Sequence, residues 1–110
     1  MKLTGQLGNF RTNKVMTVAE YSKQNVTFVA LATPKDKAFQ ALAPQGKAPV
    51  LETPSGVIAC SNSIVRYLAS TAKTLQGEND FQKAQIDSWV DFCAQELEPA
   101  IQALVLPIFG

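Results

Sequence analysis

The residues best suited to chemistry lie in one stretch, residues 46–63, which reads GKAPVLETPSGVIACSNS. Ser61 is predicted to be the N-cap of a helix, because a serine side chain can accept a hydrogen bond from the free N–H groups of a first helical turn. Pro49 stands just before a short apolar run, a position where proline is tolerated and where an X-Pro bond can be cis. A cis Ala48-Pro49 bond would expose the backbone of Ala48 near the start of that helix. The pattern therefore predicts a site for an anion or a carboxylate.

Cys60 directly precedes the predicted cap, and two interpretations apply to it. At the entrance to a helix, a cysteine can have a lowered pKa and a reactive thiolate. Cysteines at strand ends are more often buried and behave as small hydrophobic residues. We favour the second interpretation.

Composition excludes several other kinds of chemistry. The 110 residues include no histidine and only two cysteines, Cys60 and Cys93, which are not CxxC-spaced, so we expect no metal site and no histidine-based catalytic dyad or triad. A net charge of +1 without a basic stripe argues against direct contact with nucleic acid. The sequence contains neither a signal-peptide pattern nor an apolar stretch of membrane-spanning length, which predicts a reduced, cytoplasmic location without membrane contact.

The elements that must position residues 46–63 follow from the apolar patterns upstream. The sequence predicts a strand at residues 2–6, a helix over residues 10–22 capped by Asn9, and a strand at residues 26–31. The second strand, VTFVAL, is a nearly continuous β-branched and aromatic run, which is typical of a strand buried on both faces. Strand, helix and strand with this spacing predict a right-handed parallel crossover.

A short helix, an antiparallel hairpin and a longer helix complete the first part of the chain. A short helix or an irregular turn is expected at residues 35–42, ending before Pro44, and the hairpin strands at residues 50–51 and 57–59 around a Thr-Pro-Ser-Gly turn. The helix after Ser61 carries an apolar stripe that would pack on the sheet, made of Ile64, Val65, Leu68, Ala69 and Ala72. The order βαβ, small helix, ββα predicts a thioredoxin-like α/β domain over residues 1–75.

Residues 76–110 differ in character. A polar linker precedes a predicted helix at residues 82–97, in which we expect Trp89 and Phe92 to be core residues rather than to stack on a ligand. After Pro99 nearly every residue is apolar, and exposed apolar surface of that extent indicates a missing partner. We therefore expect residues 100–110 to pack against a segment absent from this chain or against a second copy, and the chain to be a fragment of a longer protein.

Two parts of the sequence resemble known families. The stretch GKAPVLETPSGVIACSNSIVRYLAS resembles the second half of the N-terminal domain of glutathione transferases, with a G-K-V-P-x-L segment, a turn, and an E-S-x-A-I-x-x-Y-L segment. Asn9-Phe10-Arg11, Lys14 and Tyr21-Ser22, together with the run QIDSWVDFCAQELEPAIQALVLPIFG, resemble the gamma subunits of translation elongation factor 1B. Transferase-like domains on aminoacyl-tRNA synthetases or assembly scaffolds are the alternatives. The resemblance implies that residues 76–110 are a linker and the first helix of an all-α C-terminal domain.

The resemblance also implies a glutathione site. Ser61 would bind the γ-glutamyl carboxylate, or would serve only as a helix cap. The backbone of Ala48, beside Pro49, would hold the extended peptide, unless the proline is retained only for the fold. Lys47 would meet the glycyl carboxylate, or would be an ordinary solvated lysine. Cys60 stands where the family has an acidic or amide residue, so the usual acceptor for the α-amino group is missing.

The catalytic group of such a site would come from the first helix. The family places a tyrosine, serine or cysteine near its N-terminus to stabilise the thiolate of glutathione. This chain offers the Asn9 amide and the Thr12 hydroxyl there, with Arg11 adding charge.

Two functions follow from the resemblance. The first is a structural and interaction module of the elongation factor 1 complex, which anchors the nucleotide-exchange subunits and can self-associate. The second is a transferase that conjugates glutathione, or a related thiol, to electrophiles. The residues at Asn9, Thr12 and Cys60 depart from the catalytic pattern and favour the first. Glutathione would then be at most a weakly bound ligand or substrate, and no other cofactor is expected.

Overall fold

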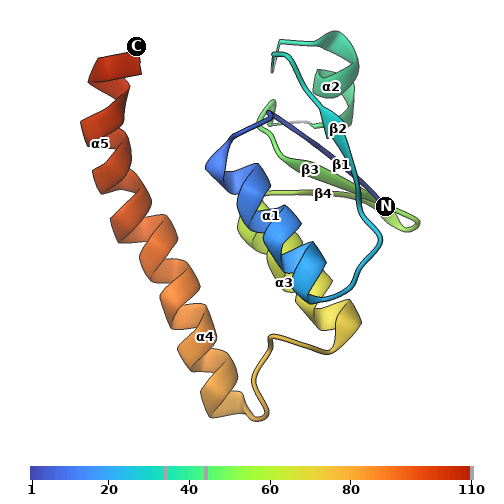
Figure 1. Cartoon of the computed structure of the whole chain (residues 1–110), viewed down its shortest axis with the longest axis vertical. Helices are drawn as coiled ribbons and strands as arrows, with labels where there is room; N and C mark the ends of the chain where they lie inside the picture. The colour runs from blue at the N-terminus through green and yellow to red at the C-terminus, as the bar shows by residue number, and fades with distance from the viewer. Residues whose placement is uncertain (34, 44, 110) are drawn as a thin grey trace. The chain divides into compact units, whose positions relative to one another are not determined.

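The computed structural model describes residues 1–33, 35–43 and 45–109, and the chain divides into two compact units, Met1–Leu75 and Gln76–Gly110 (Figure 1). The elements of the first unit are β1 (Lys2–Gly5), α1 (Phe10–Tyr21), β2 (Thr27–Ala30), α2 (Lys37–Leu42), β3 (Val50–Thr53), β4 (Gly56–Ala59) and α3 (Ser61–Ala72). This order confirms the predicted thioredoxin-like arrangement. Pro44, before which the sequence predicts the small helix to end, and Gly110 lie outside the described residues.

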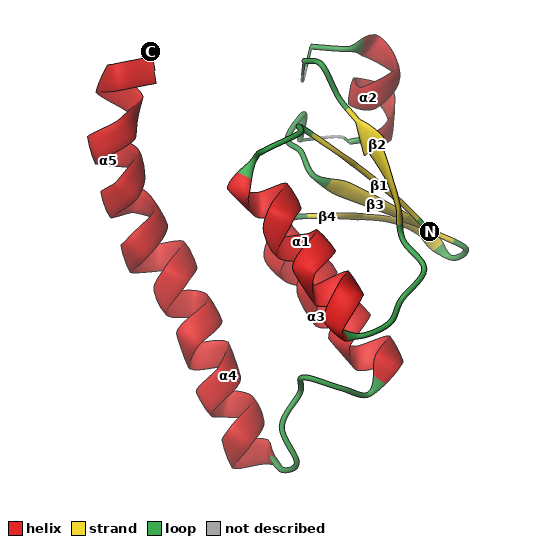
Figure 2. Ribbon diagram, in the orientation of Figure 1, coloured by secondary structure: helices red, strands yellow, loops and turns green. Residues whose placement is uncertain are grey.

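The four strands form one sheet in the order β2-β1-β3-β4 (Figure 2). β1 pairs in parallel with β2, placing Leu3 opposite Phe28, which confirms the predicted parallel pairing. β3 pairs antiparallel with both β1 and β4, and Leu51 lies opposite Leu3 on one side and Ile58 on the other. Residues that are distant in the sequence therefore form a continuous apolar row across the sheet.

The main core lies between this row and the helices α1 and α3, which pack against each other. Leu3, Leu51, Val15, Ile64 and Leu68 are completely buried there. Successive residues of a strand point to opposite faces, so the neighbour of Leu51, Val50, packs on the other face of the sheet.

A second, smaller cluster accordingly covers part of that other face. It joins Val50 with Phe39 and Ala43, at α2 and just after it. α2 is held at its start by Asp36, whose Oδ1 accepts a hydrogen bond from the Phe39 N–H at 3.0 Å.

The prediction that the second strand is buried on both faces is wrong. β2 is an edge strand, because it pairs with β1 on one side only. Phe28 packs against the main core, but Thr27, Val29 and Ala30 are exposed. A continuous β-branched run is compatible with a buried strand but does not specify one, since burial depends on the neighbours that the strand acquires.

The hairpin confirms its prediction, and its turn is fixed by one side chain. The Oγ1 atom of Thr53 accepts hydrogen bonds from the Ser55 and Gly56 N–H groups, each at 3.2 Å, and donates to the Gly56 carbonyl oxygen at 2.8 Å. Gly56 has a φ of +144°, a conformation that side-chain-bearing residues rarely adopt.

The second unit consists of one uninterrupted helical run after the linker. It comprises α4 (Asp80–Phe92), a π-helical segment η1 (Cys93–Leu97) and α5 (Glu98–Phe109). Asn79 caps α4, its Oδ1 accepting from the Gln82 N–H at 2.9 Å. The helical run thus extends well past the predicted end at residue 97. Pro99, which has no N–H to donate, closely follows the π-helical segment η1, where the regular α-helical hydrogen-bond pattern is already interrupted.

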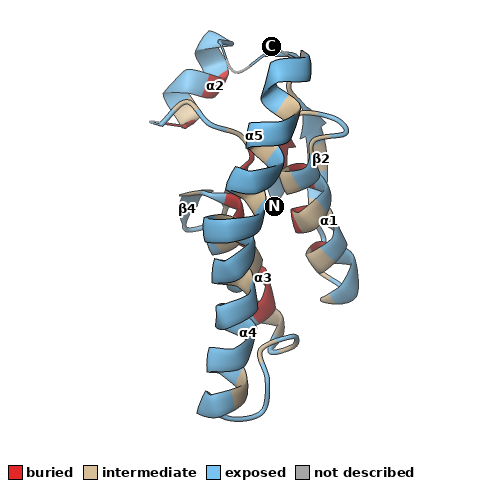
Figure 3. Cartoon of the chain, turned by 90° about the vertical axis from the view of Figure 1, so that its left-hand side faces the viewer, coloured by how far each residue is buried: buried red, intermediate tan, exposed pale blue. Residues whose placement is uncertain are grey.

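The prediction that Trp89 and Phe92 are core residues is wrong for this chain. Trp89 is 70% exposed and Phe92 is 46% exposed, although their rings contact each other edge to face with centroids 5.9 Å apart. No residue of α4 or η1 is buried, and in Figure 3 this run is drawn as intermediate and exposed. The second unit by itself is a single helical run, so it contains no second layer of its own that could cover the apolar stripe. No helix among the described residues is long and apolar enough to cross a membrane.

Candidate functional site

Thr12 lies in the first turn of α1 and is buried against the end of β1. A Cβ atom added to Gly5 would lie 2.5 Å from Thr12 Oγ1 and 3.3 Å from Pro49 Cβ, so only glycine fits between these residues. Thr12 is 3% exposed, and its hydroxyl makes no hydrogen bond within the described residues. The structure therefore places the Thr12 hydroxyl in a packed junction between β1, α1 and the Pro49 segment.

Asn9 is the N-cap of α1, as predicted. Its Oδ1 atom accepts a hydrogen bond from the Arg11 N–H at 2.9 Å. The guanidinium carbon of Arg11 lies 4.7 Å from the centre of the Phe10 ring. Because the Asn9 oxygen is already engaged, the amide NH₂ is the donor group that this side chain offers to a ligand.

The segment before β3 contains the remaining predicted backbone site. The Ala48-Pro49 peptide bond is cis, which confirms the prediction. Pro49 is completely buried, Ala48 is half-buried and Lys47 is exposed. Pairing of β3 with both neighbouring strands begins at Val50, so Ala48 lies outside the ladder of the sheet.

The prediction that Ser61 is the N-cap of α3 is wrong by one residue. Cys60 occupies the cap position with φ 75° and ψ 118°, and its carbonyl oxygen accepts the first helical hydrogen bond, from the Ile64 N–H at 3.0 Å. Ser61 is the first helical residue and is 7% exposed. β4 pairs up to Ala59, so a single residue has to turn the chain into the helix. A non-glycine residue at such a φ costs about 1–3 kcal/mol.

Cys60 also contradicts the favoured interpretation of a small buried residue, because its side chain is exposed. The backbone N–H of Ser63 contributes most to lowering the pKa of the Cys60 thiol, partial burial opposes the shift, and the Asn62 N–H, the Ser63 hydroxyl and the Lys14 ammonium add to it. The thiol makes no capping hydrogen bond of standard geometry. The pKa of the Cys60 thiol is nonetheless lowered, as expected where the free N–H groups of a first helical turn stabilise a thiolate.

A link between α1 and α3 brings Lys14 to this end of α3. Its Nζ donates a hydrogen bond to Asn62 Oδ1 at 2.6 Å, joining residues 48 positions apart. The sequence analysis did not predict that Asn62 and Ser63 act on Cys60, or that Lys14 lies beside them. No local sequence pattern could have indicated the hydrogen bond between Lys14 and Asn62, since it forms only because α1 and α3 pack together.

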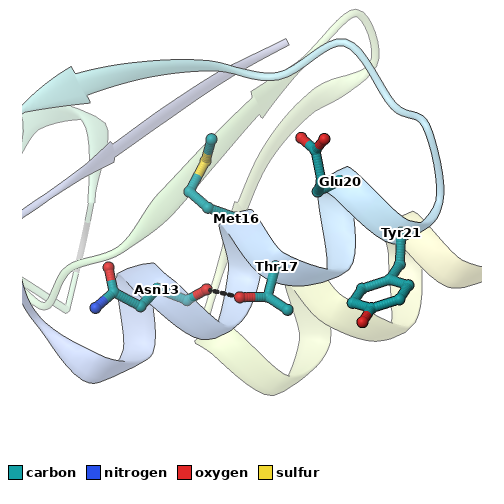
Figure 4. A pocket seen from close by; sticks show the side chains of 5 residues that line it. All are labelled: Asn13, Met16, Thr17, Glu20 and Tyr21. Atoms are coloured by element: carbon teal, nitrogen blue, oxygen red, sulfur yellow. Dashed lines mark hydrogen bonds between the residues drawn. The ribbon is translucent and has the colours of Figure 1, made fainter.

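A separate pocket lies along one face of α1 (Figure 4). Its lining residues are Asn13, Met16, Thr17, Glu20 and Tyr21. All five belong to one helix, and the hydrogen bond from Thr17 Oγ1 to the Asn13 carbonyl oxygen at 2.7 Å is internal to it. None of the predicted site residues contributes, so this pocket is distinct from the region around Thr12 and Cys60.

Comparison with known proteins gives consistent results. Residues 8–77 match the family model described as the N-terminal domain of glutathione S-transferase. Elongation factor 1-gamma of Artemia salina is 39% identical over 107 residues, covering 93% of this chain and 24% of that protein. The probable elongation factor 1-gamma 2 of Arabidopsis thaliana is 34% identical over 109 residues, covering 94% of this chain and 26% of that protein. The chain thus spans about a quarter of the length of these relatives.

Solved structures extend the comparison to three dimensions. A theta-class glutathione S-transferase from Xanthomonas axonopodis pv. citri, with glutathione bound, superimposes with a TM-score of 0.80 and 27% identity, over 86% of this chain and 48% of that one. Glutathione transferase F7 from Populus trichocarpa gives a TM-score of 0.84 at 25% identity, over 99% of this chain and 58% of that one.

Proposed function

The chain belongs to the glutathione S-transferase N-terminal domain family, and we propose that it is the transferase-like part of an elongation factor 1-gamma subunit that acts as a structural and interaction module. In this role it anchors the nucleotide-exchange subunits of the elongation factor 1 complex in the cytoplasm and supports protein synthesis. One observation carries the proposal: the similarity to elongation factor 1-gamma proteins covers 93–94% of the chain. It therefore continues beyond residues 8–77, the part matched by the family model.

The geometry around α3 supports a module over an efficient enzyme. A thiol at Cys60 replaces the carboxylate or amide that would accept the α-amino group of glutathione. Losing one such charge-assisted contact costs about 1.5–3 kcal/mol, or roughly ten- to a hundredfold in affinity. The Thr12 hydroxyl is buried in the junction with Gly5 and Pro49, away from the solvent that a substrate would enter from.

The test of the module uses the full-length gene product mixed with purified nucleotide-exchange subunits of the elongation factor 1 complex. We expect co-elution in size-exclusion chromatography with multi-angle light scattering, with a mass that fits a defined stoichiometry. A full-length protein that elutes separately from every exchange subunit at micromolar concentration would refute the anchoring role.

A second function, glutathione conjugation, is favoured by one specific observation. The theta-class neighbour has glutathione bound and shares 27% identity with this chain. The groups at hand for the ligand are the Asn9 amide, the Ala48 backbone, Lys47 and the first turn of α3 at Ser61.

Steady-state conjugation by the full-length protein, with calorimetry and retention on immobilised glutathione, separates the two functions. Three variants apply: Ser61→Ala, Asn9→Ala and Thr12→Val, the last of which keeps the packing volume and removes only the hydroxyl. Ser70→Ala, on the exposed side of the same helix α3, is the matched control. We expect weak binding and slow turnover. Turnover at ordinary enzyme rates that Ser61→Ala or Thr12→Val abolishes, and that Ser70→Ala leaves intact, would establish an enzyme instead.

A further inference from the structure

We draw no further inference here: the strongest candidate, the exposed Cys60 thiol at the N-terminal end of α3 with Lys14 close by, is a lone cysteine at a helix N-terminus, and no second feature of the described residues points to a ligand there.

Discussion

Both compact units contain helices with apolar residues along one side, but the units differ in what covers these residues. In the first unit, Leu3, Leu51 and Leu68 are completely buried between the sheet and two helices. In the second unit, Leu104 is 72% exposed and Ile108 is 71% exposed. An apolar stripe at helical spacing therefore predicts a surface that needs covering, but burial requires a second layer.

The largest expected effect is the loss of a core leucine in the first unit. Leu68→Ala should lower the free energy of unfolding by about 2–5 kcal/mol, because the side chain is fully buried in a packed cluster and its removal leaves a cavity. Leu104→Ala, the matched change at an exposed site, should shift it by less than about 0.5 kcal/mol. Urea unfolding followed by circular dichroism measures both. Equal losses from the two variants would mean that Leu104 is packed in solution.

Leu68→Ala and Leu104→Ala can also be compared in the full-length protein, where the apolar residues of α5 can be covered. We expect residues 100–110 to pack there against a further segment or a second copy, because Glu98 is the one charged residue among the 12 of α5 and a single helix cannot bury its own apolar side chains. Leu104→Ala should then cost as much as Leu68→Ala, and the amide protons of α5 should be protected from hydrogen exchange. Solvated, rapidly exchanging amides in the full-length protein would contradict this expectation.

A smaller effect is expected at the close approach of Gly5 in β1 to Thr12 in α1. Gly5→Ala should destabilise it by about 1–3 kcal/mol, because the new Cβ would meet Thr12 Oγ1 at 2.5 Å. The double variant Gly5→Ala/Thr12→Ala removes that contact and should recover part of the loss, giving a coupling energy of at least about 0.5 kcal/mol. Denaturant melts of the two single variants and the double variant measure it. Strictly additive losses would show that the two residues do not contact each other.

Removing a helix cap should lower the free energy of unfolding by about 1 kcal/mol in the first unit but not in the second. Asn9→Ala removes the acceptor for the Arg11 N–H and should lower the stability of the first unit by about 0.5–2 kcal/mol, while Asn9→Asp keeps an acceptor and should retain most of it. Asn79→Ala removes the same type of cap from α4. Because no residue of α4 is buried, Asn79→Ala should reduce helix content at the start of α4 without moving the main unfolding transition. A shift of that transition by Asn79→Ala would mean that the units unfold together.

The smallest effect is expected in the rate at which the Cys60 thiol is alkylated. In a Cys93→Ser background, alkylation of Cys60 by iodoacetamide should follow a pH profile whose midpoint lies below the usual pKa of cysteine, because the first turn of α3 and Lys14 stabilise the thiolate. Alkylation should therefore be faster near neutral pH than in a short unfolded peptide of the same sequence. Lys14→Gln should move the midpoint slightly upward, since the Lys14 ammonium is the weakest of the groups that lower the pKa. A profile that matches the peptide would refute the lowered pKa.

Features set by neighbours in the sequence could be predicted. The cap at Asn9, the turn around Thr53 and Gly56, and the stripe with Ile64 and Leu68 all depend on residues within about one or two turns of each other. Their chemistry is therefore visible in the sequence, and the structure has each of them at the expected place. The cis Ala48-Pro49 bond belongs with them, because it was indicated by a proline directly before a strand.

Features set by residues distant in the sequence could not be predicted. The exposure of β2 depends on its place at the sheet edge, and the exposure of Trp89 follows from the second unit being a single helical run. The cap of α3 was assigned to Ser61 because serine is a preferred cap residue, whereas Cys60 takes this position with φ 75° and Ser61 is the first helical residue. Lys14 reaches Asn62 only through the packing of α1 on α3. Burial, exposure and charge at the candidate site are properties of these long-range contacts, so the tertiary structure alone decided them.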